Sequence, residues 1–331
     1  MSGSGRRAVL LGAAAALGLA QPALVRPAMA QAAPWPSRPI RFIVPFAPGG
    51  ASDTTARLTG QHLSQRLGQP VVVENKAGAA SVIGTAEAAR AAPDGYTILL
   101  APPPFVITQF AYPNLPYDPE AAFRPVVLLV TSPSLLFSRT GLATGGWPEI
   151  LQMAKARPGV LTYGSPGNGS LPHLAMELLK LRTGVDILHV PYRGGGPAAA
   201  DLAGGRIDLM ISSPLDMAGN LASGRAVPVA AATARRARAF PDLPTLGELG
   251  VPDYDSSGWF GVVMPAATPD AIATRLNTEF QAVLRVEEVA ARLLTLGVEP
   301  AGGSAADFQG HLTAERNRWR VAVPAAGVTV Q

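Results

Sequence analysis

The sequence contains no cysteine among its 331 residues. Disulfide bonds, thiol catalysis and lipid attachment through an N-terminal cysteine are therefore excluded. Charged residues are also scarce, at 15% of the chain, against about 25% in typical globular domains. The hydrophobic fraction of 48% is ample for buried cores. This composition indicates a folded chain with a weakly charged surface, which suits an extracytoplasmic protein better than a nucleic-acid binder.

Known catalytic and cofactor motifs are absent as well. The phosphate-binding P-loop, the G-x-S-x-G nucleophile motif and the H-E-x-x-H metal motif do not occur. Glycines at 164, 167 and 169 only loosely resemble a dinucleotide fingerprint. Without an acid/base pair or an activated nucleophile, we expect no enzyme and no cofactor. No metal site is expected either, because the four histidines lack metal-ligand spacing: His62, His173, His189 and His311.

Most of the net positive charge comes from the N-terminus. Residues 1–30 hold three arginines and no acidic residue, so their removal lowers the formal net charge from +4 to +1. The pair Arg6-Arg7, the apolar run after it and the small residues Ala28 and Ala30 predict a secretory signal cleaved near Ala30. The arginine pair leaves both the twin-arginine and the general secretory route open. We expect a periplasmic protein with no nucleic-acid partner.

Two segments place a glycine-rich turn between a strand and a helix. The first turn contains Gly49 and Gly50, and the second contains Gly167 and Gly169. Glycine lets a ligand approach the backbone, and the free N–H groups and dipole of the following helix favour an anion. Two such turns predict two lobes that share one ligand.

Three polar residues flank these turns. Asp53 and Ser170 are predicted to be the N-caps of the two helices, and each can also contact the ligand. His173 falls in the first turn of the second helix, where the helix dipole disfavours imidazolium. A neutral structural hydrogen-bonding role and a ligand contact are both open for His173.

Alternating strand and helix patterns predict an α/β architecture. Apolar runs at residues 40–44, 71–73 and 96–100 indicate strands, with helical patterns between them. This order implies parallel strands joined by right-handed crossovers. A second unit repeats it, with a helix from Ser170 to Gly184, strands at 185–190, 207–211 and 227–232, and a short helix at 197–203.

Two stretches, residues 126–137 and 256–264, are predicted to cross between the lobes. Two crossings return the chain to its first lobe and create a hinge. We therefore predict domain 1 over residues 31–125 plus 256–331 and domain 2 over residues 126–255.

Short motifs recur along nearly the whole predicted mature chain. They include Val71-Val72-Val73-Glu74-Asn75, Pro93-Asp94-Gly95-Tyr96-Thr97, Leu115-Pro116-Tyr117-Asp118-Pro119, Tyr163-Gly164-Ser165-Pro166-Gly167 and His189-Val190-Pro191-Tyr192-Arg193-Gly194. Together they resemble the Bug family, the periplasmic solute-binding proteins of tripartite tricarboxylate transporters. The resemblance implies a type II periplasmic binding protein fold, with two α/β lobes, crossing hinge strands and a ligand cleft between the lobes.

The resemblance also implies a function and a site. A small carboxylate would be held between the two glycine-rich loops and delivered to membrane permease subunits by a monomer. The alternative is a periplasmic carboxylate sensor that docks on a signalling membrane protein. The implied ligand-binding residues are Pro48, Gly49, Gly50 and Asp53 in the first loop, Ser165, Gly167, Asn168, Gly169, Ser170 and His173 in the second, and Ser212, Ser213 and Pro214 on the far wall.

One segment departs from the family pattern. Pro102, Pro103 and Pro104 follow the third predicted strand, where many relatives carry a polar turn. Three prolines supply no backbone N–H, so a second or third carboxylate would stay unpaired there. We expect a ligand with one carboxylate in the loops and an apolar or aromatic body, preferred over citrate. The alternative is that the prolines only stiffen a rim loop away from the ligand.

Overall fold

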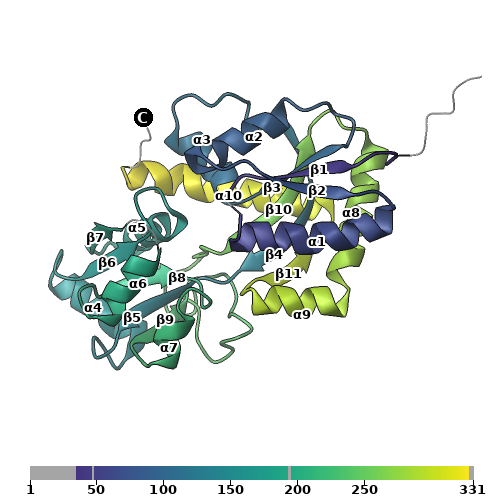
Figure 1. The fold of residues 1–331 in the computed structure, drawn as a ribbon. Helices are drawn as coiled ribbons and strands as arrows, with labels where there is room; N and C mark the ends of the chain where they lie inside the picture. The colour runs from purple at the N-terminus through teal and green to yellow at the C-terminus, as the bar shows by residue number, and fades with distance from the viewer. Residues whose placement is uncertain (1–34, 47, 193–194, 328–331) are drawn as a thin grey trace, which may run out of the picture. The chain divides into compact units, whose positions relative to one another are not determined.

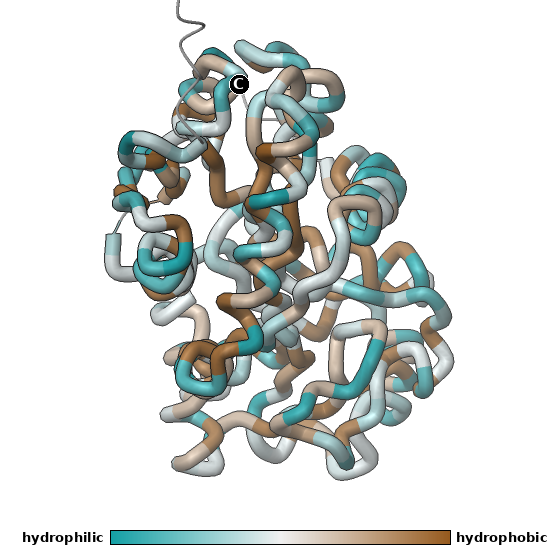
Figure 2. Tube along the Cα trace, turned by 90° about the vertical axis from the view of Figure 1, so that its right-hand side faces the viewer, coloured by the Kyte–Doolittle hydropathy of each residue, from teal (hydrophilic) through white to brown (hydrophobic). Residues whose placement is uncertain are grey.

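Two open β-sheets with helices packed on them make up the described part of the chain (Figure 1). The computed structural model describes residues 35–46, 48–192 and 195–327. The predicted secretory signal at residues 1–30 lies outside these ranges. Figure 2 shows hydrophobic segments running through the interior, with many hydrophilic segments on the outer loops and helices.

The first sheet has six strands in the order β11-β4-β10-β3-β1-β2. Strand β1 pairs in parallel with both β2 and β3, as the predicted strand-helix-strand order requires. Strand β10 runs antiparallel to β3 and β4, and β11 runs antiparallel to β4. The strands are β1 (Ile40–Val44), β2 (Val71–Asn75), β3 (Thr97–Ala101), β4 (Phe123–Ser132), β10 (Gly258–Pro265) and β11 (Glu299–Gly302).

The second sheet has five strands in the order β7-β6-β8-β5-β9. Strand β6 pairs in parallel with β7 and β8, and β5 runs antiparallel to β8 and β9. The strands are β5 (Leu135–Arg139), β6 (Thr162–Ser165), β7 (Leu188–Pro191), β8 (Leu209–Ser212) and β9 (Ala226–Ala231).

Helices connect the strands and cover the sheets. Gly68 and Gly184 end α1 and α5 in the left-handed conformation, as predicted. Among the helices of the described residues, none combines the length and apolarity needed to cross a bilayer. The helices are α1 (Ala51–Leu67), α2 (Val82–Ala89), α3 (Pro104–Ala111), α4 (Gly146–Ala156), α5 (Leu171–Thr183), α6 (Gly195–Ala203), α7 (Ala218–Ala222), α8 (Asp270–Leu284), α9 (Glu287–Thr295) and α10 (Ala305–Ala325), with a 3-10 turn at Ala79–Ser81.

Several elements differ from the sequence expectation, and two of them lie next to the predicted site. The strand predicted at residues 185–190 begins only at Leu188, because Asp186 accepts a hydrogen bond from Gly159, in the turn before β6. Helix α3 was not predicted at all. Its first residue is Pro104, and a missing N–H is harmless in the first turn of a helix.

Both parallel units have the same topology. Strand β1 lies between β2 and β3, and β6 lies between β7 and β8. After each central strand, the next strand of the chain pairs on one side of it, and a later strand pairs on its other side. This reversal is the topological switch point, where ligands of open α/β sheets bind beyond the carboxyl ends of the strands. The loops that follow β1 and β6 are the two glycine-rich turns.

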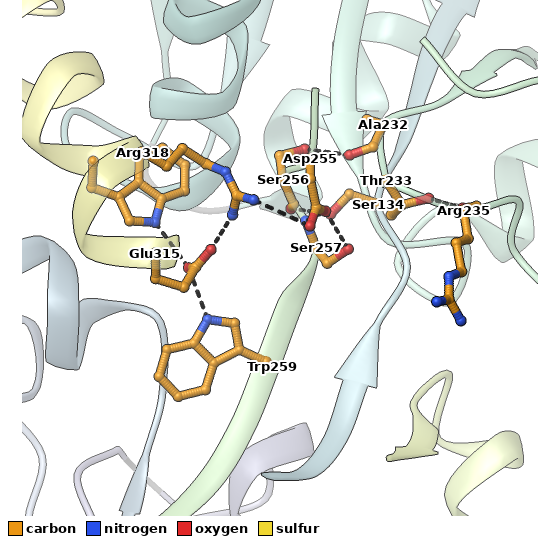
Figure 3. A network of polar contacts seen from close by, with 11 residues as sticks. Ser134, Ala232, Thr233, Arg235, Asp255, Ser256, Ser257, Trp259, Glu315 and Arg318 are labelled. Carbon is orange, nitrogen blue, oxygen red and sulfur yellow. Dashed lines mark hydrogen bonds and ion pairs between the residues drawn. The ribbon is translucent and has the colours of Figure 1, made fainter. Parts of the chain in front are cut away.

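The chain passes between the sheets twice. Strand β4 ends at Ser132 in the first sheet and β5 begins at Leu135 in the second, so the predicted boundary at residue 126 falls inside β4. The division into two domains stays a prediction. The returning segment is hydrogen-bonded to the outgoing one, because the Ser134 hydroxyl donates to the Ser256 carbonyl at 3.0 Å (Figure 3).

Helix α10 is attached to this returning segment through a buried carboxylate. Glu315 is 1% exposed and accepts hydrogen bonds from the indole N–H groups of Trp259 and Trp319, each at 2.9 Å (Figure 3). Arg318 pairs with Glu315 and reaches Asp255 at 3.2 Å. Three donors on one buried carboxylate offset the cost of removing its charge from water.

The Glu315→Ala variant tests this anchor. It leaves two buried indole N–H groups and the Arg318 guanidinium without their acceptor, so we expect a loss of about 3–5 kcal/mol in the free energy of unfolding. Urea denaturation measures the change. Glu288→Ala, on the exposed side of α9, is the control and should stay within about 0.5 kcal/mol. Equal stabilities of the two variants would show that Glu315 is not an anchor.

Candidate ligand-binding site

The first glycine-rich loop joins β1 to α1. Pro48, Gly49 and Gly50 are exposed, and Gly49 has a φ of 92°, which side chains rarely adopt. The first helical hydrogen bond runs from the Thr54 N–H to the Gly50 carbonyl. The N–H groups of residues 51–53 therefore precede the helical ladder and form the donor end of α1.

Asp53 holds this loop from inside. Its side chain is only 5% exposed, and its oxygens accept hydrogen bonds from the Gly49 N–H at 2.9 Å, Arg57 Nε at 3.0 Å and Asn75 Nδ2 at 2.9 Å. Burial raises the pKa of Asp53, but the hydrogen bonds from Arg57, Gly49 and Asn75 outweigh it and bring the pKa below its usual value. Asp53 is therefore an ionised carboxylate with its oxygens engaged by the protein.

The predicted N-cap role of Asp53 is wrong. Gly50 is the N-cap of α1, and Asp53 is the third helical residue, whose carboxylate reaches back to the loop. Two partners were missed. Arg57 stands four residues after Asp53, the spacing of a helical ion pair, so the sequence signalled it. Asn75 ends β2 beside β1, and its amide also donates to the Phe46 carbonyl at 3.1 Å.

The second glycine-rich loop joins β6 to α5, and its predicted cap is confirmed. The Ser170 hydroxyl accepts from the His173 N–H at 3.4 Å and donates to the Gly167 carbonyl at 2.7 Å. Gly167 and Gly169 have φ values of 135° and 75°, so both positions favour glycine. Asn168, between them, is exposed.

The two helix N-termini differ in their donors. Pro172 has no N–H, and the His173 N–H is taken by the cap, so Leu171 is the residue of the first turn of α5 that keeps a backbone donor. The equivalent turn of α1 keeps three. The backbone donors for an anion are therefore concentrated on the first loop.

Three aromatic rings stack beside the second loop, and two of them are hydrogen-bonded to it. The rings of His173 and His189 are 4.1 Å apart, and Tyr163 stacks on His189 at 4.7 Å. His173 Nδ1 accepts from the Gly169 N–H at 3.0 Å, and His189 Nε2 lies 2.7 Å from Ser165 Oγ. His173 thus has the structural hydrogen bond that the sequence left as one of two roles.

Both histidines are held neutral. Burial lowers the pKa of His173, and burial together with the neighbouring His173 lowers the pKa of His189 to about 4. Because Nδ1 of His173 is an acceptor, its neutral ring carries the proton on Nε2. Tyr163 and His189 were missed as supporting residues, although both stand in motifs that carried the family resemblance.

The predicted far wall follows β8. Ser212 is buried at the end of the strand, and the Ser213 hydroxyl accepts from the Asp216 N–H at 3.1 Å. Pro214 comes next and is partly exposed. These residues have the same place after β8 that the proline segment has after β3.

The proline segment opens α3 without free donors. Pro102 and Pro103 are buried, and Pro104, at the first helical position, is partly exposed. None of the three prolines has a backbone N–H. The next two N–H groups, those of Phe105 and Val106, donate to the carbonyls of Pro102 and Pro103 at 2.8 and 3.0 Å. This helix end therefore differs from the donor end of α1.

The predicted site residues contact one another within each loop. A cavity of about 460 Å³ beside the second loop is lined by Asn168, His173, Glu177, Lys180 and His189 among others, and by no described residue of the first loop. That one ligand is held by both loops stays a prediction.

Two α/β units, each with a glycine-rich loop at its switch point and joined by two crossing segments, define a two-lobed solute-binding protein. The chain belongs to the tripartite tricarboxylate transporter receptor family, whose model matches residues 55–328. Its members are solute-binding receptors and not enzymes.

Three solved structures are similar over nearly their whole length. Rpa4515 of R. palustris, solved with adipate, is 37% identical, with a TM-score of 0.74 over 89% of this chain and 99% of that one. The periplasmic binding protein BugD is 33% identical, with a TM-score of 0.71 over 90% and 100%. MatC (Rpa3494) from Rhodopseudomonas palustris, solved with malate, is 30% identical, with a TM-score of 0.70 over 87% and 99%. The Bug-type fold predicted from the sequence is confirmed.

His189 gives the stability a pH dependence of defined sign. Its pKa of about 4 in the folded chain lies below the ordinary 6.5, so its contribution is complete above pH 6.5 and falls as the pH drops toward 4. We expect the melting temperature of the unmodified protein to fall more steeply between pH 6.5 and 5 than that of His189→Gln. Differential scanning fluorimetry measures both slopes. His62→Gln should keep the steep slope, and a steep slope in His189→Gln would contradict the assignment.

Proposed function

We infer that this chain captures a small carboxylate between the loops after β1 and β6 and delivers it to the permease of a tripartite tricarboxylate-type transporter. The observation that carries this function is the position of each loop at the switch point of its sheet, in front of a helix N-terminus. Neither residues 46–53 nor residues 165–173 include Lys or Arg. Backbone N–H groups, the helix dipole and hydroxyls would therefore supply the complement to the anion.

The similar structures support a carboxylate ligand. Rpa4515 was solved with adipate and MatC with malate, two small dicarboxylates. We propose that the ligand of this chain places one carboxylate against the donor end of α1, with the Ser170 hydroxyl opposite. Pro48, Gly49, Gly50, Gly167, Asn168 and Gly169 would surround it. Asp53, Ser165 and His173 would support these loops from inside.

The proline segment supports a ligand with an apolar body. The N-terminal end of α3 has its first N–H groups bonded to Pro102 and Pro103, so it offers no donor to a further carboxylate. Acids with one carboxylate and an apolar carbon body, such as benzoate, should bind more tightly than citrate. Ser212, Ser213 and Pro214 would complete the opposite wall.

Export to the periplasm and docking on permease subunits complete the proposal. The likeness to the periplasmic protein BugD supports this location, and the receptor family supports transport. The sensor alternative is not favoured by these relatives. We expect the chain to act as a monomer.

A ligand screen tests binding without turnover. Adipate, malate, benzoate and citrate are compared by thermal shift and isothermal titration calorimetry, and the bound acid is recovered after long incubation. We expect at least one acid to raise the melting temperature, because a ligand of the native state stabilises it by mass action, and we expect recovery unchanged. Tighter binding of citrate than of benzoate would contradict the apolar wall. Conversion of an acid would contradict the binding role.

The Ser170→Ala variant tests the second loop. It removes the cap and a hydroxyl proposed for the ligand, so calorimetry should show binding weaker by about 1–2 kcal/mol, or roughly 5–30-fold. Gly169→Val should weaken it further, because valine does not adopt a φ of 75° readily. Ser304→Ala is the matched control, since Ser304 caps α10 through Asp307. It should lower stability and leave affinity unchanged.

A further inference from the structure

We propose that His173 is a positioning residue. Its neutral ring, stacked on His189, holds the second loop in its binding conformation, and this hold is lost when the ring is protonated in acid. This role rests on the proposed carboxylate binding. The stability of the loop conformation can be measured without any ligand, so the positioning role and the carboxylate binding can be tested separately.

The geometry shows why the loop depends on this ring. Gly169 lies directly before the Ser170 cap, and its N–H donates to His173 Nδ1 at 3.0 Å. His173 is 5% exposed and stacks on His189, which lies 2.7 Å from the Ser165 hydroxyl at the start of the loop. Both ends of the loop are thus bonded to one pair of stacked rings.

The surroundings of the pair set its charge state. Tyr163 on β6 stacks on His189 and donates its hydroxyl to Glu177 at 2.5 Å. Lys180, one turn further along α5, binds the same carboxylate oxygen at 2.8 Å. The charged side chains that line the 460 Å³ cavity next to both histidines are Glu177, Lys180 and Asp186, which precedes β7. Burial lowers the pKa of His173 and outweighs the attraction of Glu177, which raises it, so the ring is neutral at neutral pH.

Protonation of His173 would break the contact with Gly169. Its Nδ1 would then carry a proton and face the Gly169 N–H, so two donors would oppose each other. The new charge would also lie against the His189 ring and near Lys180. A cationic His173 in direct contact with the ligand would have the opposite effect, because it would attract a carboxylate more strongly in acid.

Two substitutions at position 173 separate these possibilities. In His173→Asn the amide oxygen can take the place of Nδ1 and accept from Gly169, without titrating. His173→Leu keeps the bulk and removes the acceptor. With adipate as the probe at pH 7.5, we expect His173→Leu to bind about tenfold more weakly, the ratio that corresponds to one hydrogen bond of about 1.4 kcal/mol. His173→Asn should restore most of this affinity.

The pH profile gives a second readout. Between pH 7.5 and 5 the affinity of the unmodified protein for adipate should fall relative to that of His173→Asn. The ratio of the two cancels the titration of adipate itself. An affinity that rises in acid for the unmodified protein, relative to His173→Asn, would assign His173 to the ligand and overturn the positioning role.

Amide hydrogen exchange of the loop, without ligand, provides a readout that ligand failure cannot affect. At neutral pH the segment 165–174 should exchange faster in His173→Leu than in the unmodified protein, while His173→Asn should resemble the unmodified protein. His62→Leu, on α1, is the control and should leave this segment unchanged. Unchanged exchange in His173→Leu would overturn the positioning role. If adipate and the other screened acids bound to no form, the proposed function would fail while the exchange experiment still decided the role of His173.

Discussion

The buried carboxylate of Glu315 joins the parts of the chain on which the two-lobed arrangement depends. Helix α10 packs against α3 and β4 of the first unit and against α5 of the second. Glu315 attaches this helix to β10 through Trp259, and Arg318 extends the connection to Asp255, on the segment that returns from the second sheet. A carboxylate with three donors has little freedom to move, so the hinge region is held by hydrogen-bond geometry as well as by apolar packing.

The two loops have equivalent positions but are supported by different chemistry. The first loop is held by the ionised carboxylate of Asp53, with Gly49, Arg57 and Asn75 as its donors. The second is held by neutral histidine rings. Asp53 has a lowered pKa and stays charged in mild acid, whereas burial lowers the pKa values of His173 and His189, so both rings are neutral at neutral pH. At neutral pH the first loop is therefore held by a charged side chain and the second by uncharged rings.

Neither glycine-rich loop contains Lys or Arg, so the proposed carboxylate binding depends on backbone N–H groups. Free N–H groups at a helix start can balance a carboxylate only if the loop before the helix keeps them pointed at the ligand. The buried side chains of Asp53 and His173 each accept a hydrogen bond from a loop glycine with a positive φ, Gly49 and Gly169 respectively, and so limit the freedom that glycine gives the loop. The prolines before α3 remove backbone donors from an otherwise similar strand-to-helix turn, so this turn is not suited to bind a carboxylate.

The sequence by itself determined the parallel units, the helix stops at Gly68 and Gly184 and the cap at Ser170, because these features depend on neighbouring residues and on local periodicity. The family resemblance added the two-lobed fold. Only the tertiary structure decided that Asp53 reaches back to the loop and that His173 stacks on His189. His173 lies on α5 and His189 on β7, and Asp53 is fixed by Asn75 at the end of β2 as well as by the nearby Gly49. The contacts between different elements depend on how parallel strands bring distant side chains to one sheet edge, which local sequence patterns do not encode.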